Sequence, residues 1–280
     1  MTVLAESTGL LEISGVSVTF GDQRAVDDVS FSIGAGERVG LIGESGSGKS
    51  MVCLTVQGLQ PRIAETTGTV RFDGQALGRG EVRGVRGRRI GSVFQEPMTA
   101  LNPVMTIGAQ LVTALRAHGL VTRRESRPRA VELAAMVGLP DPAHIIDRYP
   151  HQLSGGQRQR VVIAMAVSCE PALVLADEPT TALDATVARK VLDLMVRLCT
   201  ELGSALLLVT HDMGVAATTC ERLMVMRHGV LVEQAPTAQL LADPQHDYTR
   251  RLIAAARSTG LDLAGAREVL ARQQQGAGNE

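Results

Sequence analysis

The residues most able to do chemistry lie between positions 43 and 50, which read GESGSGKS. This stretch contains Lys49, one of only two lysines in a chain that uses arginine for nearly all of its other positive charge. Glycines let a backbone curl so that successive N–H groups point at phosphate oxygens, and a lysine ammonium is a compact charge that can reach the β- and γ-phosphates. A serine after the lysine can place its hydroxyl on Mg²⁺. The pattern predicts a phosphate-binding loop made of Gly43, Glu44, Ser45, Gly46, Ser47, Gly48, Lys49 and Ser50.

Polar residues also follow three short apolar runs elsewhere in the chain. Short apolar runs that alternate with helical patterns predict buried parallel strands of an α/β sheet. Ligands of such sheets bind beyond the carboxyl ends of the strands, so we expect the polar residues to converge with the phosphate loop on one site. The runs 173–176, 205–210 and 90–94 lead, respectively, to Asp177 with Glu178, to His211 and to Gln95.

These four side chains suit phosphoryl transfer, which needs mainly positioning and charge neutralisation. Asp177 can hold the hydration shell of Mg²⁺, and Glu178 can orient and deprotonate the attacking water. His211 can sense the γ-phosphate, while Gln95 can reach either the metal or the water. Taken singly, an acidic pair after a strand is often a helix cap and a lone histidine is usually structural. Together with the phosphate loop, the combination favours hydrolysis of a nucleoside triphosphate.

A second helix start with the features of an anion site lies at residues 153–160, which read LSGGQRQR. Ser154 and Gln157 form a capping-box pattern, which is a sufficient structural explanation. However, Gly155 and Gly156 beside a bare helix N-terminus can also bind an anion. One chain would then have two phosphate-binding helix starts and one suitable lysine. A composite site resolves this, with the Ser154 segment of one subunit closing over a nucleotide held by Lys49 of another.

The composition excludes several classes of protein. The chain has 280 residues, 45% hydrophobic residues and only 2% aromatic residues, so we expect a sizeable aliphatic core. The net charge of −1 and the pI of about 6.6 lack the basic footprint of a nucleic-acid-binding protein. No apolar stretch reaches the ~18 residues that indicate a membrane span. The four cysteines are scattered, which favours buried free thiols over a metal site or disulfides.

At this point the motifs resemble those of a known family. The segments GESGSGKS, VFQEP, LSGGQRQR, LVLADEP, ALDA and THD occur in the order and spacing of an ABC-transporter ATP-binding subunit, over about residues 10–255. The resemblance implies ATP and Mg²⁺ as cofactors, with Ser50, Gln95 and Asp177 at the metal. It implies that Gln95 lies in the Q-loop, that Glu178 is the catalytic carboxylate and that His211 is the switch histidine. It also implies that Asp184 lies in a dimer-contacting D-loop and that the signature motif consists of Ser154, Gly155, Gly156 and Gln157.

The adenine contact and the fold class also follow from the resemblance. Phe20 stands where the family stacks an aromatic residue on adenine, although core packing is a competing explanation. The implied fold is α/β, with a P-loop (RecA-like) ABC ATPase core, an antiparallel β subdomain and an inserted α-helical subdomain at about 102–157. Alternating patterns over 11–34 and 69–74 and helical periodicity over 102–150 agree with this division. The polar segment 256–280 is expected to be a loosely ordered tail.

Two further segments resemble the branch of peptide, nickel and opine importers. These are 94–108, FQEPMTALNPVMTIG, and 246–255, HDYTRRLIAA. The second differs from the branch, which usually has His-Pro-Tyr where this chain has His246, Asp247 and Tyr248. The resemblance implies an ATP-hydrolysing motor subunit of an ABC importer for peptides, nickel or related small solutes. It also implies a position at the cytoplasmic face of the inner membrane.

The implied partners are two integral membrane permeases, a second ATP-binding subunit and an extracytoplasmic substrate-binding protein, with no nucleic acid. A paralogue is favoured over a second copy as the other ATPase. The main alternative is a soluble ABC-type ATPase that acts on DNA, ribosomes or Fe–S assembly without transport. A small-molecule kinase is a third possibility, but it leaves LSGGQRQR unexplained. The transported substrate stays open, because it is selected by other chains.

Overall fold

The computed structural model describes residues 9–78, 80–95, 97–181 and 183–258. The described residues form two compact units, one within Met1–Arg83 and Leu207–Glu280 and the other within Gly84–Leu206. The division falls within strand β8 (Ala205–Thr210) and within the one-turn helix α2 (Val82–Val85). Within the described ranges, no helix is long and apolar enough to cross a membrane.

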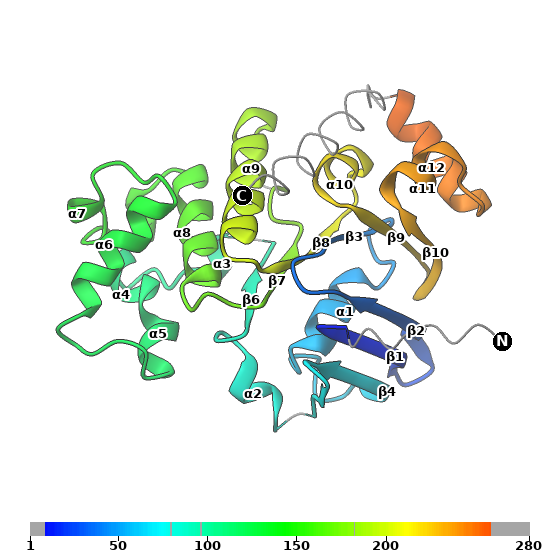
Figure 1. The fold of residues 1–280 in the computed structure, drawn as a ribbon, viewed down its shortest axis with the longest axis horizontal. Coiled ribbons are helices and arrows are strands. Elements are labelled where there is room, and N and C mark those ends of the chain that lie inside the picture. The colour runs from blue at the N-terminus through cyan, green and yellow to red at the C-terminus, as the bar shows by residue number, and fades with distance from the viewer. Residues whose placement is uncertain (1–8, 79, 96, 182, 259–280) are drawn as a thin grey trace. The chain divides into compact units, whose positions relative to one another are not determined.

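The first unit contains an antiparallel sheet with the strand order β2-β1-β4-β5 (Figure 1). Its strands are β1 (Leu11–Phe20), β2 (Gln23–Ile33), β4 (Glu65–Phe72) and β5 (Gln75–Ala76). In β1 the buried residues are Leu11, Ile13, Val16 and Val18, with a register shift between Ile13 and Val16. Leu11 pairs with Ile33 on one side and with Phe72 on the other. The predicted antiparallel strands are therefore confirmed, with β4 starting four residues earlier than its pattern indicated.

The same unit contains the buried strand that precedes the phosphate loop. This strand, β3 (Arg38–Ile42), is buried at every residue and runs parallel to β9 (Arg222–Arg227). Strand β10 (Val230–Pro236) pairs antiparallel with β9 as a hairpin. The helices of this unit are α1 (Lys49–Val56), α10 (Met213–Thr219), α11 (Thr237–Ala242) and α12 (Asp247–Ser258). Helix α12 includes the first three residues of the predicted tail, and residues 259–280 lie outside the described residues.

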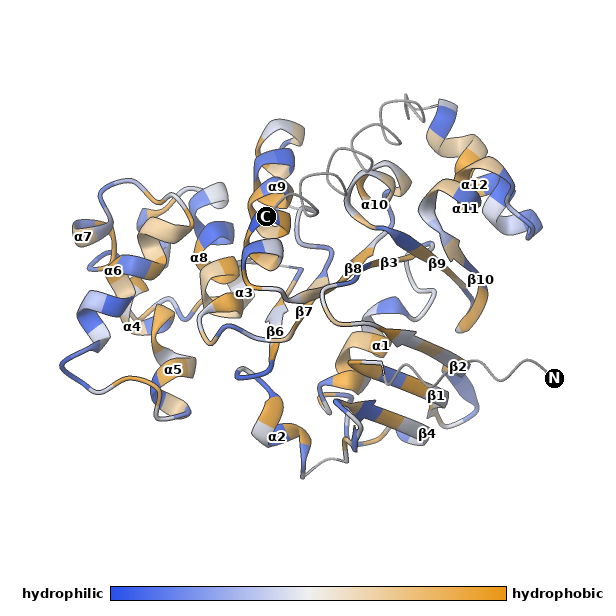
Figure 2. Cartoon of the chain, viewed as in Figure 1, coloured by the Kyte–Doolittle hydropathy of each residue, from blue (hydrophilic) through white to orange (hydrophobic). Residues whose placement is uncertain are grey.

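The second unit combines a parallel strand pair with a group of helices. Strands β6 (Ile90–Val93) and β7 (Leu173–Asp177) pair in parallel, as their apolar runs predict. Between them the chain forms α3 (Pro97–Ala100), α4 (Ile107–Leu111), α5 (Thr113–Ala117), α6 (Ser126–Met136), α7 (Pro142–Ile145), the 3₁₀ turn η1 (Pro150–Gln152) and α8 (Gly155–Val167). Helix α9 (Ala185–Glu201) follows β7 and is visibly amphipathic in Figure 2. The helical periodicity over 102–150 is thus confirmed, although it is divided among short helices.

The cysteines depart in part from the expectation of buried thiols. Three cysteines are buried, but Cys169 is only half-buried at the end of α8, where burial raises the pKa of its thiol. Before β6 the chain forms the short helix α2, in which Val82 is buried, and a bridge between Arg86 and Ile90.

Candidate nucleotide-binding site

The predicted phosphate loop connects β3 to α1 in the first unit. Its backbone approaches neighbouring segments so closely that only glycine fits at two positions. A Cβ atom at Gly43 would lie 2.2 Å from the Met226 carbonyl oxygen, and one at Gly48 would lie 2.3 Å from the Ala25 carbonyl oxygen. Gly48 also has a φ of +102°, in the region that favours glycine. The glycines therefore let the loop curl tightly against β2 and β9.

Lys49, the first residue of α1, is folded back over this loop. The residue is only 4% exposed. The ammonium Nζ donates hydrogen bonds of 2.8 Å to the carbonyl oxygens of both Gly43 and Glu44, and lies 3.4 Å from the Ser47 hydroxyl oxygen. The loop carbonyls thus hold the Lys49 ammonium at the N-terminus of α1, which is the positive end of the helix. This is the chemistry of an anion site, and it suits the phosphates of a nucleotide.

The loop is also tied to the turn between β9 and β10 and to helix α12. The Gly229 N–H donates to the Ser47 carbonyl oxygen at 3.0 Å. The Glu44 N–H donates to the hydroxyl oxygen of Tyr248 at 3.1 Å. Neither Gly229 nor Tyr248 was predicted to act at this site, because sequences distant along the chain carry no signal of such contacts. Tyr248 belongs to the 246–255 segment, which sequence analysis connected only with a branch of importers.

His211 and Phe20 occupy accessible positions in the same unit. His211 is exposed at the junction between β8 and α10. Asp212 fixes this junction by accepting hydrogen bonds from the N–H groups of Gly214 (2.7 Å) and Val215 (3.1 Å) as the N-cap of α10. Phe20 is half-buried at the end of β1 and is not among the buried core side chains. Core packing is therefore a poor explanation for Phe20, and its contact with adenine stays a prediction.

The second unit brings Gln95 and Glu178 together, as predicted. Asp177 ends β7, and Glu178 follows it with a φ of +46°. A left-handed conformation costs a non-glycine residue about 1–2 kcal/mol, so surrounding contacts must hold it. Gln95 Nε2 lies 3.4 Å from Glu178 Oε2, and the Thr181 hydroxyl donates to the same oxygen at 2.9 Å. Thr181 was not predicted, and its only signal is its position three residues after the acid.

The LSGGQ segment forms the predicted capping box at the start of α8. Ser154 Oγ accepts from the Gln157 N–H at 3.3 Å, and Gln157 Oε1 accepts from the Ser154 N–H at 3.0 Å. Ser154 and Gly155 are exposed, so the helix start is open to a ligand or a partner. Gln159 is fully buried and donates through Nε2 to the Pro179 carbonyl oxygen at 2.6 Å. The signature helix is therefore linked directly to the segment that carries Glu178.

Asp184, predicted to contact a second subunit, has a structural role in this chain. Its carboxylate accepts a hydrogen bond from the Val187 N–H at 3.0 Å and is the N-cap of α9. The residue is exposed, and capping engages only one of its oxygens. The cap therefore does not preclude the predicted dimer contact, which stays a prediction.

The donor set fits magnesium better than a metal held entirely by protein. The described residues contain no group of three or more His, Cys, Asp or Glu side chains that could hold a metal ion. Mg²⁺ is usually bound by one or two carboxylates together with water and substrate phosphates. Each unit by itself offers oxygen donors: the Ser50 hydroxyl in the first, and the Asp177 carboxylate and the Gln95 amide oxygen in the second. These oxygen donors are chemically appropriate for an ion that arrives with the nucleotide.

Comparison with known proteins connects this geometry to one family. Residues 26–181 match the family model described as ABC transporter. The chain belongs to this ABC transporter family. An oligopeptide transport ATP-binding protein of Bacillus subtilis is 43% identical over 87% of this chain and 77% of its own length. A dipeptide transport ATP-binding protein of Escherichia coli is 42% identical over 88% of this chain and 78% of its own length.

A solved structure gives the same assignment. It is a dimeric ATP-binding cassette in a post-hydrolysis state bound to ADP and phosphate, and it is 32% identical to this chain. The alignment covers 81% of this chain and 98% of that one, with a TM-score of 0.71. The ABC ATPase fold predicted from the motifs is therefore confirmed, and the chain is an ATP-hydrolysing ABC cassette.

The close approach at Gly43 makes a testable prediction. We expect Gly43→Ala to weaken ATP binding by at least about tenfold, because the added methyl group must displace either the loop or β9. The matched control is Gly74→Ala, since Gly74 also has a positive φ (+73°) but lies in open space. Calorimetric titration with ATP measures both. Equal losses in the two variants would show that general backbone strain, not the shape of the loop, limits binding.

Proposed function

We propose that this ABC cassette is the ATP-hydrolysing motor of an importer for peptides or related small solutes. The proposal is supported by the names of relatives that align along most of their length, which are oligopeptide and dipeptide transport ATP-binding proteins. The observation that carries the hydrolytic part is the pairing of Gln95 and Thr181 with one oxygen of Glu178. Two neutral donors thus contact one oxygen of the carboxylate that would receive the proton of the attacking water.

In this proposal the residues divide the work of hydrolysis. Lys49 and the backbone of the phosphate loop bind the β- and γ-phosphates, and Phe20 stacks on adenine. Ser50, Asp177 and Gln95 would hold Mg²⁺, which would supply positive charge to offset that of the phosphates. Glu178 accepts a proton from the water that attacks the γ-phosphorus, and the bond from that phosphorus to the ADP oxygen breaks. His211 senses the presence of the γ-phosphate.

A second ATP-binding subunit completes the proposed site. The exposed start of α8, at Ser154 and Gly155, would close over the nucleotide held by the Lys49 loop of the partner, and Asp184 would contact that partner. Hydrolysis and release of phosphate would then open the dimer. The solved relative bound to ADP and phosphate is a dimer, which supports this arrangement.

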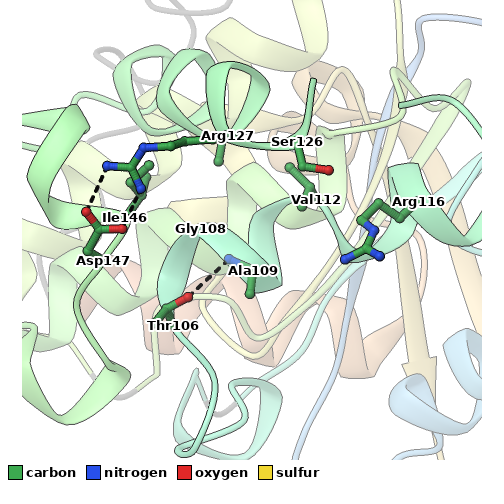
Figure 3. Close-up of a pocket in the computed structure, with 10 residues that line it drawn as sticks. Thr106, Gly108, Ala109, Val112, Arg116, Ser126, Arg127, Ile146 and Asp147 are labelled. Atoms are coloured by element: carbon green, nitrogen blue, oxygen red, sulfur yellow. Dashed lines mark hydrogen bonds and ion pairs between the residues drawn. The ribbon is translucent and has the colours of Figure 1, made fainter. Parts of the chain in front are cut away.

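Two membrane permeases and an extracytoplasmic binding protein complete the proposed importer, at the cytoplasmic face of the inner membrane. A candidate surface for a permease is a pocket of about 170 Å³ among the helices of the second unit (Figure 3). Arg127 and Asp147 form an ion pair on one side of the pocket, and Arg116 lies apart from this pair. A short permease segment with an apolar residue and an acidic one would match this lining. The lining includes Thr106, Ala109, Val112, Arg116, Arg127 and Asp147.

Glu178→Gln tests the proposed chemistry. Because the amide cannot accept the proton of water, we expect turnover to fall by about 100-fold or more while ATP still binds. The variant should then accumulate as an ATP-bound dimer with its partner subunit. Glu201→Gln is the matched control, since Glu201 pairs with Arg197 on the exposed side of α9. Phosphate release measures turnover, and normal steady-state hydrolysis by Glu178→Gln would remove this residue from its role.

A subtler change tests how Glu178 is oriented. Thr181→Val removes the hydroxyl that donates to Glu178, and we expect kcat to fall about tenfold with little change in the KM for ATP. Thr181→Ser keeps the hydroxyl and should retain most of the activity. A normal kcat in Thr181→Val together with a loss in Thr181→Ser would mean that the methyl group, not the hydrogen bond, supports the site.

A further inference from the structure

The 246–255 segment reaches the nucleotide site through one side chain. Tyr248, on the first turn of α12, is only 3% exposed, and its hydroxyl oxygen accepts a hydrogen bond of 3.1 Å from the Glu44 N–H. The two residues are 204 positions apart in the chain. The proposed function uses the phosphate loop but assigns nothing to Tyr248.

The peptide group that Tyr248 contacts is also the one that Lys49 contacts. A peptide unit is planar, and in its trans form the C=O and N–H groups point in opposite directions. The unit between Gly43 and Glu44 donates its N–H to Tyr248 and accepts from Lys49 Nζ through the Gly43 oxygen at 2.8 Å. The described residues contain no cis peptide bonds. Fixing the N–H therefore also fixes the direction of the carbonyl that orients the ammonium.

Tyr248 is itself held on several sides. The guanidinium of Arg227 lies 4.9 Å from the centre of the phenol ring, in a cation–π contact. The Tyr248 N–H donates to His246 Nδ1 at 3.1 Å, and the His246 N–H donates to the carboxylate of Glu233 at 3.0 Å. Burial raises the pKa of the Tyr248 hydroxyl, so the group stays neutral at physiological pH. The contact thus comes from a fixed side chain rather than from a mobile surface residue.

Packing alone does not explain a tyrosine at this position. A phenylalanine would fill the same volume and keep the contact with Arg227, but it could not accept from the Glu44 N–H. The departure from the His-Pro-Tyr pattern does not disturb the arrangement either, because Asp247 turns to pair with Arg250 on the exposed side of α12. Tyr248 contacts the loop directly, and His246 contacts Tyr248 and Glu233.

We propose that Tyr248 is a positioning residue for ATP, which fixes the Gly43–Glu44 peptide plane of the phosphate loop and makes α12 a brace of the nucleotide site. This inference rests on the proposed assignment of Gly43–Ser50 as that loop. When the ammonium leaves the Gly43 carbonyl for a phosphate, the brace keeps the peptide plane in place. Without the hydrogen bond to Tyr248, part of the free energy of ATP binding must be used to order the loop.

The composition of the chain allows a direct test by ¹⁹F NMR. The chain has two tyrosines and no tryptophan, so a 3-fluorotyrosine-labelled protein gives one resonance from Tyr149 and one from Tyr248. Tyr149→Phe assigns the two signals and serves as the matched control, because Tyr149 is 39% exposed and stacks on His151. We expect MgADP to shift the Tyr248 resonance and to leave the Tyr149 resonance in place.

Kinetics supply the second readout. We expect Tyr248→Phe to raise the KM for ATP about fivefold, the effect of losing one ordinary hydrogen bond, with kcat and the melting temperature unchanged. Tyr149→Phe should leave KM unchanged. An unmoved Tyr248 resonance at saturating MgADP, or an unchanged KM in Tyr248→Phe, would overturn the inference and leave the phosphate loop assigned. If calorimetry detects no binding of MgADP to the unaltered chain, the loop assignment fails and the inference fails with it.

Discussion

The nucleotide site depends on a buried ammonium that is satisfied by its own loop. A charged lysine is almost never as buried as Lys49 unless it is paired, because removing its charge from water is costly. Here the charge is stabilised by the carbonyl oxygens of Gly43 and Glu44, which the curled backbone turns toward it. The loop can adopt this curl only because glycines stand where Met226 and Ala25 approach. The carbonyl oxygens hold the Lys49 ammonium in the loop before the nucleotide binds. When a phosphate arrives, the ammonium can exchange these carbonyl dipoles for a full negative charge.

A different kind of preorganisation holds the second unit. Glu178 adopts a backbone conformation that is unfavourable for its residue type, and hydrogen bonds from Thr181 and Gln95 hold its carboxylate. Buried Gln159 ties α8 to the segment just after Glu178 through the Pro179 carbonyl. A movement of α8 can therefore be transmitted through Gln159 and Pro179 to Glu178. This link gives the proposed closure of a second subunit over Ser154 a way to influence the chemistry.

The phosphate loop, the signature helix start and the core strands could be predicted from the sequence, because their signals are local. GESGSGKS, the Ser154–Gln157 capping box and the apolar runs of β3, β6 and β7 each depend on a few neighbouring residues. The pairing of Gln95 with Glu178 was also predictable, since both follow neighbouring parallel strands. By contrast, Tyr248 and Gly229 reach the loop from the other end of the chain, and no periodicity records such contacts. The left-handed conformation of Glu178 was equally hidden, because glutamate is not a residue that suggests a positive φ.

The most direct test of the central claim is to identify what the chain binds in its native membrane. A tagged chain would be expressed in its own cell, loaded with Mg²⁺ and a non-hydrolysable ATP analogue, and extracted gently from membranes. The account predicts that two integral membrane permeases and a second ATP-binding subunit co-purify with it, and that their binding protein reveals the solute. Recovery of a soluble dimer with cytoplasmic partners and no membrane protein would contradict the importer and leave only the ATPase.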